Sequence, residues 1–362
     1  MKKNFLTIFP LGENVHLTKD VGMIPYVLMK EGYYNSKISF YCDESDLPSL
    51  RKEVEGLEYK RIKKYSKYEE LNILYFLLVN ISNLDVVMLF HPDKKKLLIA
   101  LIIKLLTLNR VKFYFKMDAN ENIKKQNFRS NGIMFSFYSF LYSFIDLISC
   151  ETKDNHRFLN NNSYFKVSYI PNGTLESRGE INNKKKLFIT VARIGSYEKD
   201  NLTLLKAIEK LDLKEWTFKL IGPIENTFNN TIEDFFNRNP HLQKSVCFTG
   251  PIYDKDILEF EYAQAKVFIL TSRSEGFPLS LVEAVSNGCY IVSTDLMPAR
   301  EVTNNGNYGK LFEIEDFERL ATVLQEIIDC KLVLPDPLEI KDYADVNFQW
   351  KNIVKNIYRL LN

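Results

Sequence analysis

The chain is poor in cysteine, with only five in 362 residues, and these five lie far apart and form no C-x-x-C pair. An odd number of widely spaced cysteines predicts reduced thiols, which excludes a disulfide framework and a cysteine-based zinc site. The sequence also lacks the motifs G-x-G-x-x-G and G-x-x-x-x-G-K-[ST], so a standard dinucleotide site and a P-loop have no support. These absences favour a cytoplasmic protein that binds its ligand by other means.

The chain also lacks an excess of charge of one sign. Its 48 basic and 46 acidic residues give a formal charge of +2, which argues against a general nucleic-acid binder. The charge is unevenly spread, because residues 1–173 hold 25 basic and 18 acidic residues and the remainder 23 and 28. The two halves therefore carry +7 and −5, and the first half is expected to face something anionic.

No apolar run reaches the roughly 20 residues that a membrane-spanning helix needs, since the longest aromatic stretch, Met134–Ile145, is interrupted by serines. The chain is instead rich enough in apolar residues, at 46%, to fold as a globular protein. A length of 362 residues suits two domains, because a domain typically takes about 150.

Short apolar runs alternate with stretches of helical spacing along both halves, which predicts βαβ units and parallel sheets. The strands expected in the first half are Phe5–Phe9, Lys37–Tyr41, Asp85–Phe90, Val111–Lys116, Leu147–Cys150 and Val167–Ile170, with helices at Val21–Glu31, Leu97–Leu108 and Met134–Ile145. Those expected in the second half are Leu187–Ala192, Thr217–Ile221, Val246–Thr249, Lys266–Thr271 and Tyr290–Thr294, with helices at Leu202–Leu211, Thr231–Asn237, Ile257–Ala265, Leu279–Asn287 and Phe317–Asp329. We therefore predict two Rossmann-like doubly wound domains, residues 1–173 and 174–343, and a C-terminal amphipathic helix in 344–362 that packs back toward the first.

One segment of the second half carries a recognisable arrangement of polar groups. The predicted strand Lys266–Thr271 leads through a loop with Glu275 and Gly276 into a helix that starts at Leu279 and carries Glu283. Gly276 lets the backbone approach a ligand, and the first amides of the helix can face a phosphate. Two carboxylates beside such a helix start are suited to accept hydrogen bonds from sugar hydroxyls. The alternative is a helix-dipole contact for Glu283 and a solvated loop charge for Glu275.

Positive charge to balance a diphosphate is expected on the same edge of the sheet. Arg193 ends the first strand of the second half, and Lys199 follows in the loop before the next helix. Arginine offers a planar pair of donors and lysine a mobile point charge for phosphate oxygens. Taken alone, this loop is better described as an exposed basic loop.

The segment Glu275–Glu283 resembles the E-x7-E motif of the GT4-type retaining glycosyltransferases, the glycosyltransferase group 1 family. Arg193 with Lys199 is similar to that family's diphosphate motif, Ile170–Gly173 (Ile-Pro-Asn-Gly) to the end of its N-terminal domain, and Ala299–Val302 to a later Glu-Val pair. The resemblance covers nearly all of the second half, and in the first half only Gly12 matches a glycine-rich donor loop.

This resemblance implies the α/β GT-B fold, in which the two domains face each other across a cleft, and a metal-independent transfer of sugar with retention. It implies that Arg193 and Lys199 bind the diphosphate, that Glu283 binds the ribose and that Glu275 binds the donor sugar. The backbone amides of Gly276, Phe277 and Leu279 would assist on the sugar and phosphate, and Gly12 would lie near the donor. No cofactor and no metal are expected, and a UDP-sugar is the favoured donor.

Three further residues are candidates for acceptor or sugar binding. His91 and Asp118 follow predicted strands of the first half, and His16 lies in the loop after Gly12. The alternatives are a structural histidine for His91, a turn or cap residue for Asp118, and a solvated loop residue for His16.

The excess positive charge has a possible location at Lys94–Lys96, followed by the apolar helix Leu97–Leu108. Together with Met134–Ile145 this helix could lie on an anionic membrane, although ordinary core helices would have the same composition. We therefore predict a glycosyltransferase of cell-surface polysaccharide or glycolipid synthesis, cytoplasmic or peripheral on the inner face of the membrane. Its partners would be a nucleotide-sugar and a glycan or lipid-linked acceptor. The alternatives are a catalytically silent partner with the same fold, and a nucleotide-sugar epimerase or a phosphorylase-like enzyme.

Overall fold

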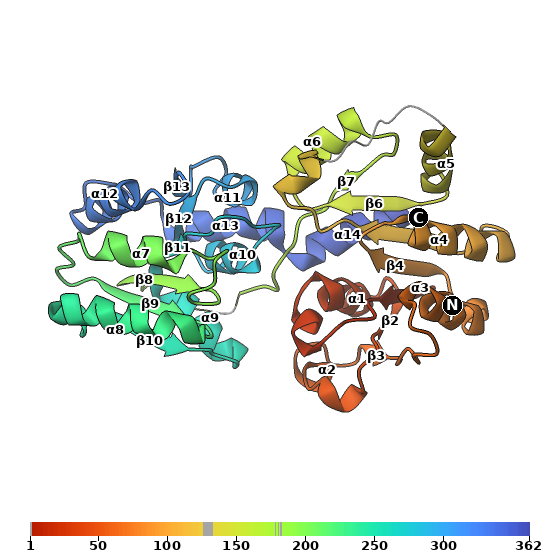
Figure 1. Ribbon diagram of the computed structural model, residues 1–362, viewed down its shortest axis with the longest axis horizontal. Coiled ribbons are helices and arrows are strands. Elements are labelled where there is room, and N and C mark those ends of the chain that lie inside the picture. The colour runs from red at the N-terminus through yellow and green to blue at the C-terminus, as the bar shows by residue number, and fades with distance from the viewer. Residues whose placement is uncertain (1, 126–132, 178, 180, 182) are drawn as a thin grey trace. The chain divides into compact units, whose positions relative to one another are not determined.

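The computed structural model describes residues 2–125, 133–177, 179, 181 and 183–362, which fall into two compact units (Figure 1). The first unit comprises Met1–Gly173 and Trp350–Asn362, and the second comprises Thr174–Gln349. The C-terminal segment that belongs to the first unit thus begins at Trp350 and not at residue 344. Phe348 is 1% exposed within the core of the second unit, and the backbone of Gln349 is extended, so one helix ends there and another begins.

The first unit is an alternation of strands and helices that ends with a helix from the C-terminus. Its strands are β1 (Asn4–Ile8), β2 (Asn35–Ser39), β3 (Glu58–Tyr59), β4 (Val86–Phe90), β5 (Lys112–Lys116), β6 (Leu147–Cys150) and β7 (Ser168–Tyr169). Its α-helices are α1 (Asp20–Lys30), α2 (Ser49–Lys52), α3 (Glu69–Val79), α4 (Lys94–Leu106), α5 (Ile133–Tyr142), α6 (Lys153–Asn162) and α14 (Trp350–Leu361).

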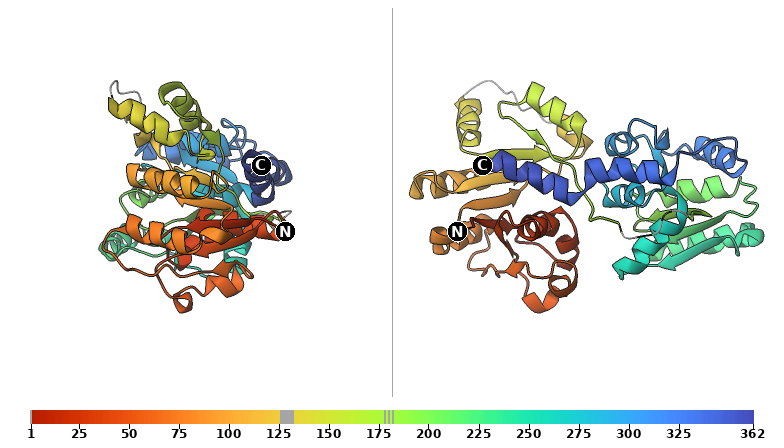
Figure 2. Two further views of the ribbon diagram at one scale, coloured as in Figure 1. Left: turned by 90° about the vertical axis from the view of Figure 1, so that its right-hand side faces the viewer. Right: turned by 180° about the vertical axis from the view of Figure 1, so that it is seen from behind.

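The seven strands form one parallel sheet in the order β3-β2-β1-β4-β5-β6-β7. Successive residues of a strand point to opposite faces, and in β4 Val86 and Met88 pack with α1 and α14 while Val87 and Leu89 pack with α3 and α4. The sheet is therefore covered on both faces, which explains why its strands are almost uniformly apolar (Figure 2).

The second unit repeats this architecture. Its strands are β8 (Lys185–Val191), β9 (Thr217–Ile221), β10 (Val246–Gly250), β11 (Ala265–Leu270), β12 (Tyr290–Thr294) and β13 (Gly309–Phe312). Its α-helices are α7 (Asn201–Ile208), α8 (Asn229–Arg238), α9 (Lys255–Gln264), α10 (Leu279–Ser286), α11 (Met297–Val302), α12 (Phe317–Ile328) and α13 (Pro337–Phe348). The six strands form a parallel sheet in the order β10-β9-β8-β11-β12-β13.

Both sheets have a point at which the strand order reverses, between β1 and β4 in the first unit and between β8 and β11 in the second. The loops that follow the two strands at such a point run in opposite directions and leave a crevice between them. Ligands of open α/β sheets bind in this crevice, at the carboxyl ends of the strands. The prediction of two doubly wound α/β domains is confirmed. Within the residues that the structure describes, none of the helices is both long enough and apolar enough to cross a bilayer.

Candidate active site

The two loops that were predicted to bind a nucleotide-sugar meet at the reversal point of the second sheet. One loop follows β8 and carries Arg193 and Lys199, and the other follows β11 and carries Glu275. Because β8 and β11 are adjacent parallel strands, their carboxyl ends lie at the same edge of the sheet. The fold therefore brings together two segments that are about 80 residues apart in the sequence.

Lys199 and Glu275 contact each other directly at this edge. The Lys199 Nζ atom lies 2.5 Å from the Glu275 Oε1 atom, and the side chains are 24% and 11% exposed. The hydroxyl of Ser272 donates a second hydrogen bond to the same carboxylate oxygen, at 2.6 Å. A half-buried lysine held by a buried carboxylate is fixed in position, so its charge is available to a ligand at a defined point.

Arg273 ties the two loops together, a role that the sequence analysis did not predict. Its N–H donates to the carbonyl oxygen of Glu198, its guanidinium lies 2.9 Å from Asp200, and it stacks 4.4 Å above the ring of Tyr197. Asp200 is 3% exposed as a residue and is the N-cap residue of α7, with a left-handed backbone at φ 45°. In the sequence, Arg273 is simply an arginine between a predicted strand and Glu275. Its position there does not indicate that it contacts another loop.

Arg193 lies at the same edge but is more exposed. Its guanidinium is 3.7 Å from the Glu198 carboxylate and 3.4 Å from that of Glu225, with 59% of the side chain accessible. Exposed ion pairs of this kind contribute little to stability, about 0–1 kcal/mol. The guanidinium can therefore exchange these partners for phosphate oxygens at small cost.

Helix α10 starts beside Glu275 and supplies backbone donors. Pro278 is its N-cap residue, and among the described residues no side chain caps the helix. The first amides of a helix have no acceptor within the helix, so those of Leu279 and Ser280 are suited to an anion. Phe277, 5% exposed, packs with its ring 6.1 Å from Phe348, which anchors the turn, and Gly276 precedes it at the surface.

Glu283 lies on the second turn of α10 and is held by a partner that the sequence did not indicate. The hydroxyl of Tyr262, a buried residue of α9, donates to the Glu283 Oε2 atom at 3.0 Å. Burial raises the pKa of the Glu283 carboxyl, and the hydrogen bond from Tyr262 opposes that shift. The other carboxylate oxygen, Oε1, is suited to accept a hydrogen bond from a ligand hydroxyl.

In the first unit, Gly12 and His16 have structural partners. A Cβ atom on Gly12 would lie 2.4 Å from the Phe40 ring, so only glycine fits there. His16 accepts a hydrogen bond from the Glu13 amide through Nδ1, at 3.0 Å, and its ring lies 5.1 Å from that of Phe9. Burial and the nearby Lys19 lower the pKa of His16, which favours its neutral form.

His91 and Asp118 follow the adjacent strands β4 and β5, and both have left-handed backbones, with φ 52° and 48°. The Nδ1 atom of His91 lies 3.0 Å from the Met117 carbonyl oxygen, and the Asp118 amide donates to Glu151 at 3.2 Å. Burial and the carboxylates of Glu151 and Asp20 raise the pKa of Asp118. The fold thus places both candidates at one edge of the sheet.

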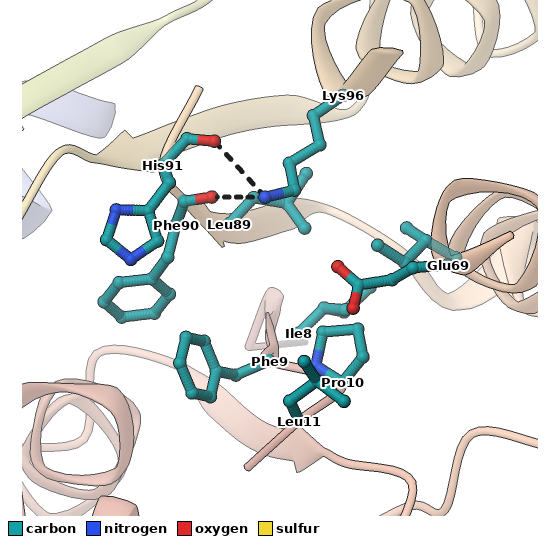
Figure 3. A pocket seen from close by; sticks show the side chains of 10 residues that line it. Ile8, Phe9, Pro10, Leu11, Glu69, Leu89, Phe90, His91 and Lys96 are labelled. Carbon is teal, nitrogen blue, oxygen red and sulfur yellow. Dashed lines mark hydrogen bonds between the residues drawn. The ribbon is translucent and has the colours of Figure 1, made fainter. Parts of the chain in front are cut away.

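A small pocket of about 160 Å³ lies at the reversal point of the first sheet (Figure 3). Its wall is mostly apolar and includes the rings of Phe9 and Phe90, whose centroids are 5.2 Å apart. Its polar groups are His91, Glu69 and Lys96, and the Lys96 ammonium donates to the carbonyl oxygens of Phe90 and His91. An apolar pocket with few polar groups suits a small organic ligand.

The architecture of both units defines the chain as an α/β protein of the GT-B class. Solved structures share this fold over nearly the whole chain. A glycosyltransferase from Rickettsia africae is 17% identical, with a TM-score of 0.76 over 99% of this chain and 98% of that one. HepE of Anabaena, solved with UDP and glucose, is 16% identical, with a TM-score of 0.71 over 99% of each chain.

Residues 173–345 match the family described as "Glycosyl transferases group 1", and this part of the chain belongs to that family. One curated relative is the sulfoquinovosyl transferase SQD2 of Arabidopsis thaliana, which is 32% identical over 152 residues, 40% of this chain and 27% of the relative. The chain matches between about a quarter and about half of the length of its curated relatives.

Proposed function

We propose that this chain is a retaining glycosyltransferase that moves a sugar from a nucleotide-sugar to an acceptor hydroxyl. The favoured donor is a UDP-sugar. The observation that carries the proposal is the pair of Lys199 and Glu275 at the reversal point of the second sheet, beside the uncapped start of α10. A cation and helix amides favour a diphosphate, while carboxylates favour hydroxyl groups. A nucleotide diphosphate linked to a sugar presents both.

In the proposed reaction the bond between the anomeric carbon and the diphosphate oxygen breaks, and the acceptor oxygen bonds to the same face of the sugar. The acceptor proton passes to an oxygen of the departing diphosphate. Lys199, Arg193 and the first amides of α10 stabilise the negative charge that develops there, while Glu275 holds the sugar. The neighbour solved with UDP and glucose supports the choice of UDP and a hexose as first probes.

The acceptor is proposed to be a growing cell-surface polysaccharide or a glycolipid, met in the cytoplasm at the inner face of the membrane. The positive first half, at +7, supports an anionic or membrane-bound acceptor partner. A catalytically silent partner protein is the second candidate. It is disfavoured because a scaffold has no need of an ordered lysine–glutamate pair at this edge.

A thermal-shift panel of UDP, GDP, ADP and their sugars tests the proposed function. A ligand that binds only the folded protein raises its melting temperature, and at a hundred times its Kd it adds about 2.7 kcal/mol of stability. One nucleotide should raise the melting temperature clearly more than the others. A flat response across the panel would favour the silent partner.

The Glu283→Ala variant is expected to bind the selected nucleotide more weakly by about 1.5–3 kcal/mol, the range for a hydrogen bond to a charged group. Titration calorimetry of wild type and variant measures this difference. The control is Glu259→Ala, which removes another carboxylate near Glu283, on α9. This variant should bind the nucleotide with wild-type affinity. Equal affinities of wild type and Glu283→Ala, in a folded variant, would remove Glu283 from the site.

Excess EDTA is expected to leave the transfer rate essentially unchanged, because side chains and helix amides supply the positive field in the proposed mechanism. The rate should be measured with the donor that the thermal-shift panel selects, before and after chelation. A loss of activity that Mg²⁺ or Mn²⁺ restores would overturn the metal-independent mechanism.

A further inference from the structure

Helices α3 and α4 of the first unit are apolar on both sides. Each helix packs one side against the sheet. On its outer side, each helix exposes an apolar stripe with the spacing i, i+4, i+7, i+8. The exposed side chains are Leu71, Tyr75, Leu78 and Val79 on α3 and Leu98, Ile102, Leu105 and Leu106 on α4, each between 38% and 64% accessible. A helix that faces water carries polar residues on its outer side, so these stripes need another explanation.

The stripes join into one surface with the neighbouring helix. Helix α3 packs against α4, and α4 packs against α5, so the three helices lie side by side over one face of the sheet, as seen in the left view of Figure 2. Helix α5 adds Phe137 and Phe140, which are 44% and 51% exposed, and Leu108 after α4 is 93% exposed. We call this surface the α3–α5 face. Apolar side chains exposed on neighbouring helices are typical of an interaction site.

Exposed lysines gather at one end of the α3–α5 face. Lys63, Lys64 and Lys67 lie in the segment that leads into α3, and Lys94 and Lys95 begin α4. Lys95 pairs with Glu70 at 2.8 Å, and Lys94 lies 5.1 Å from the centre of the Tyr138 ring on α5. Lys96, which the sequence analysis placed on this surface, instead turns inward to the carbonyl oxygens of Phe90 and His91.

Acidic residues are few on this face. Helix α4 contains none beyond its N-cap residue Asp93, and the two of α3, Glu69 and Glu70, lie in its first turn, so all three lie at the lysine end. An apolar surface with lysines along one end is complementary to an anionic bilayer, whose headgroups attract the lysines and whose interface takes up the apolar side chains. A protein partner would require an acidic rim around an apolar surface of its own.

The lysine end of the face coincides with the pocket of the first sheet. Glu69 of α3 and Lys96 of α4 belong to its wall (Figure 3). Ile73 of α3 also lines it. A molecule whose tail lies in a bilayer against the α3–α5 face would present its head at this pocket.

We propose that the α3–α5 face docks the protein onto an anionic membrane, with the apolar stripes in the interface and Lys63, Lys64, Lys67 and Lys94 on the headgroups. The pocket then receives the head of a lipid-linked acceptor, an assignment that rests on the proposed function. Membrane docking itself stands apart from catalysis, because the donor loops belong to the other unit.

Vesicle flotation of the full chain tests the docking. The apolar variant is Val79→Gln, Leu105→Gln, Leu106→Gln, which changes three of the most exposed positions and keeps good helix formers. The lysine variant is Lys63→Gln, Lys67→Gln, Lys94→Gln. The matched control is Val333→Gln, Leu338→Gln, Val346→Gln, which replaces similarly exposed apolar residues of the second unit. Each protein is mixed with phosphatidylcholine vesicles that contain or lack phosphatidylglycerol.

Wild type and control are expected to float with the anionic vesicles and to be released by high salt. Both test variants should bind about a hundredfold more weakly, given about 1 kcal/mol for each lysine and more for each buried leucine. Equal flotation with both vesicle types, no flotation, or wild-type flotation of the apolar variant would each overturn the proposal. If the wild type formed dimers but did not bind vesicles, and the apolar variant did not form dimers, the face would instead contact a second copy of the chain.

The selected nucleotide should raise the melting temperature of all four proteins equally. This readout separates the two ideas, because vesicle binding without a nucleotide response would refute the proposed function alone. A nucleotide response without vesicle binding would refute the docking alone.

Discussion

Replacing Lys199 with methionine is expected to lower kcat about 10²–10³-fold while changing nucleotide affinity much less. Lys199 is held 2.5 Å from Glu275, and in the proposed mechanism its charge lies where the leaving diphosphate gains negative charge. A fixed donor at such a point acts more strongly on the transition state than on the bound substrate. Steady-state kinetics with the selected donor give kcat, and calorimetry gives the affinity for the nucleotide.

The matched control is Lys186→Met, since Lys186 also pairs with a glutamate, Glu215, at 2.6 Å, but lies at the opposite end of β8. Its kcat should equal that of wild type. If Lys199→Met lost affinity and kept kcat, Lys199 would serve binding alone, and the proposed stabilisation of the leaving group would be wrong.

Replacing Lys116 with methionine is expected to lower the free energy of unfolding by about 3–5 kcal/mol. Lys116 and Glu151 are both completely buried and lie 2.5 Å apart, and Asp20 lies 3.4 Å from the same ammonium group. Burial alone would lower the pKa of Lys116, but the two carboxylates outweigh it and raise that pKa. Without the lysine, two carboxylates stay buried with no cation, which accounts for the large effect. Urea unfolding measures the loss.

Lys95→Met is the control, because Lys95 forms an exposed ion pair with Glu70, and exposed pairs of this kind contribute little to stability. The double variant Lys116→Met, Glu151→Gln should recover part of the loss, since it removes the stranded charge. A loss for Lys116→Met no greater than that of the control would contradict the expected cost of leaving the two buried carboxylates without a cation.

Most strands were predictable because buried parallel strands are short apolar runs with clear breaks on both sides. The strand predicted at Lys37–Tyr41 lies two residues later than the observed β2, Asn35–Ser39. Asn35 and Ser36 are polar and are not typical of a buried strand. The elements that were not predicted are helices α2, α3, α6, α11 and α13 and strands β3 and β13. Helix α3 is apolar on nearly all sides after its first turn, so its sequence does not alternate between an apolar and a polar side. Helix α13 begins at Pro337, two residues after Pro335, and two prolines so close together do not indicate a helix.

The candidate site was predictable as a set of residues but not as a set of contacts. The motif around Glu275 and Glu283 and the cations Arg193 and Lys199 are local patterns, and the roles assigned to them stay predictions. Their partners are not local, since Tyr262 holds Glu283 from another helix and Arg273 reaches back to Asp200 and Tyr197. Sequence spacing carries no information on such contacts.

The sequence by itself determined the alternating α/β elements, the two parallel sheets and the family resemblance of the second half, because these depend on hydrophobic period and on motifs within a few residues. Only the tertiary structure decided which lysines face water, with Lys94 and Lys95 exposed, Lys96 turned inward and Lys104 buried beside Asp146. It also decided that the outer sides of α3 and α4 are apolar. A side chain's neighbours depend on which helix packs on which face of a sheet, and that is set by contacts between distant segments.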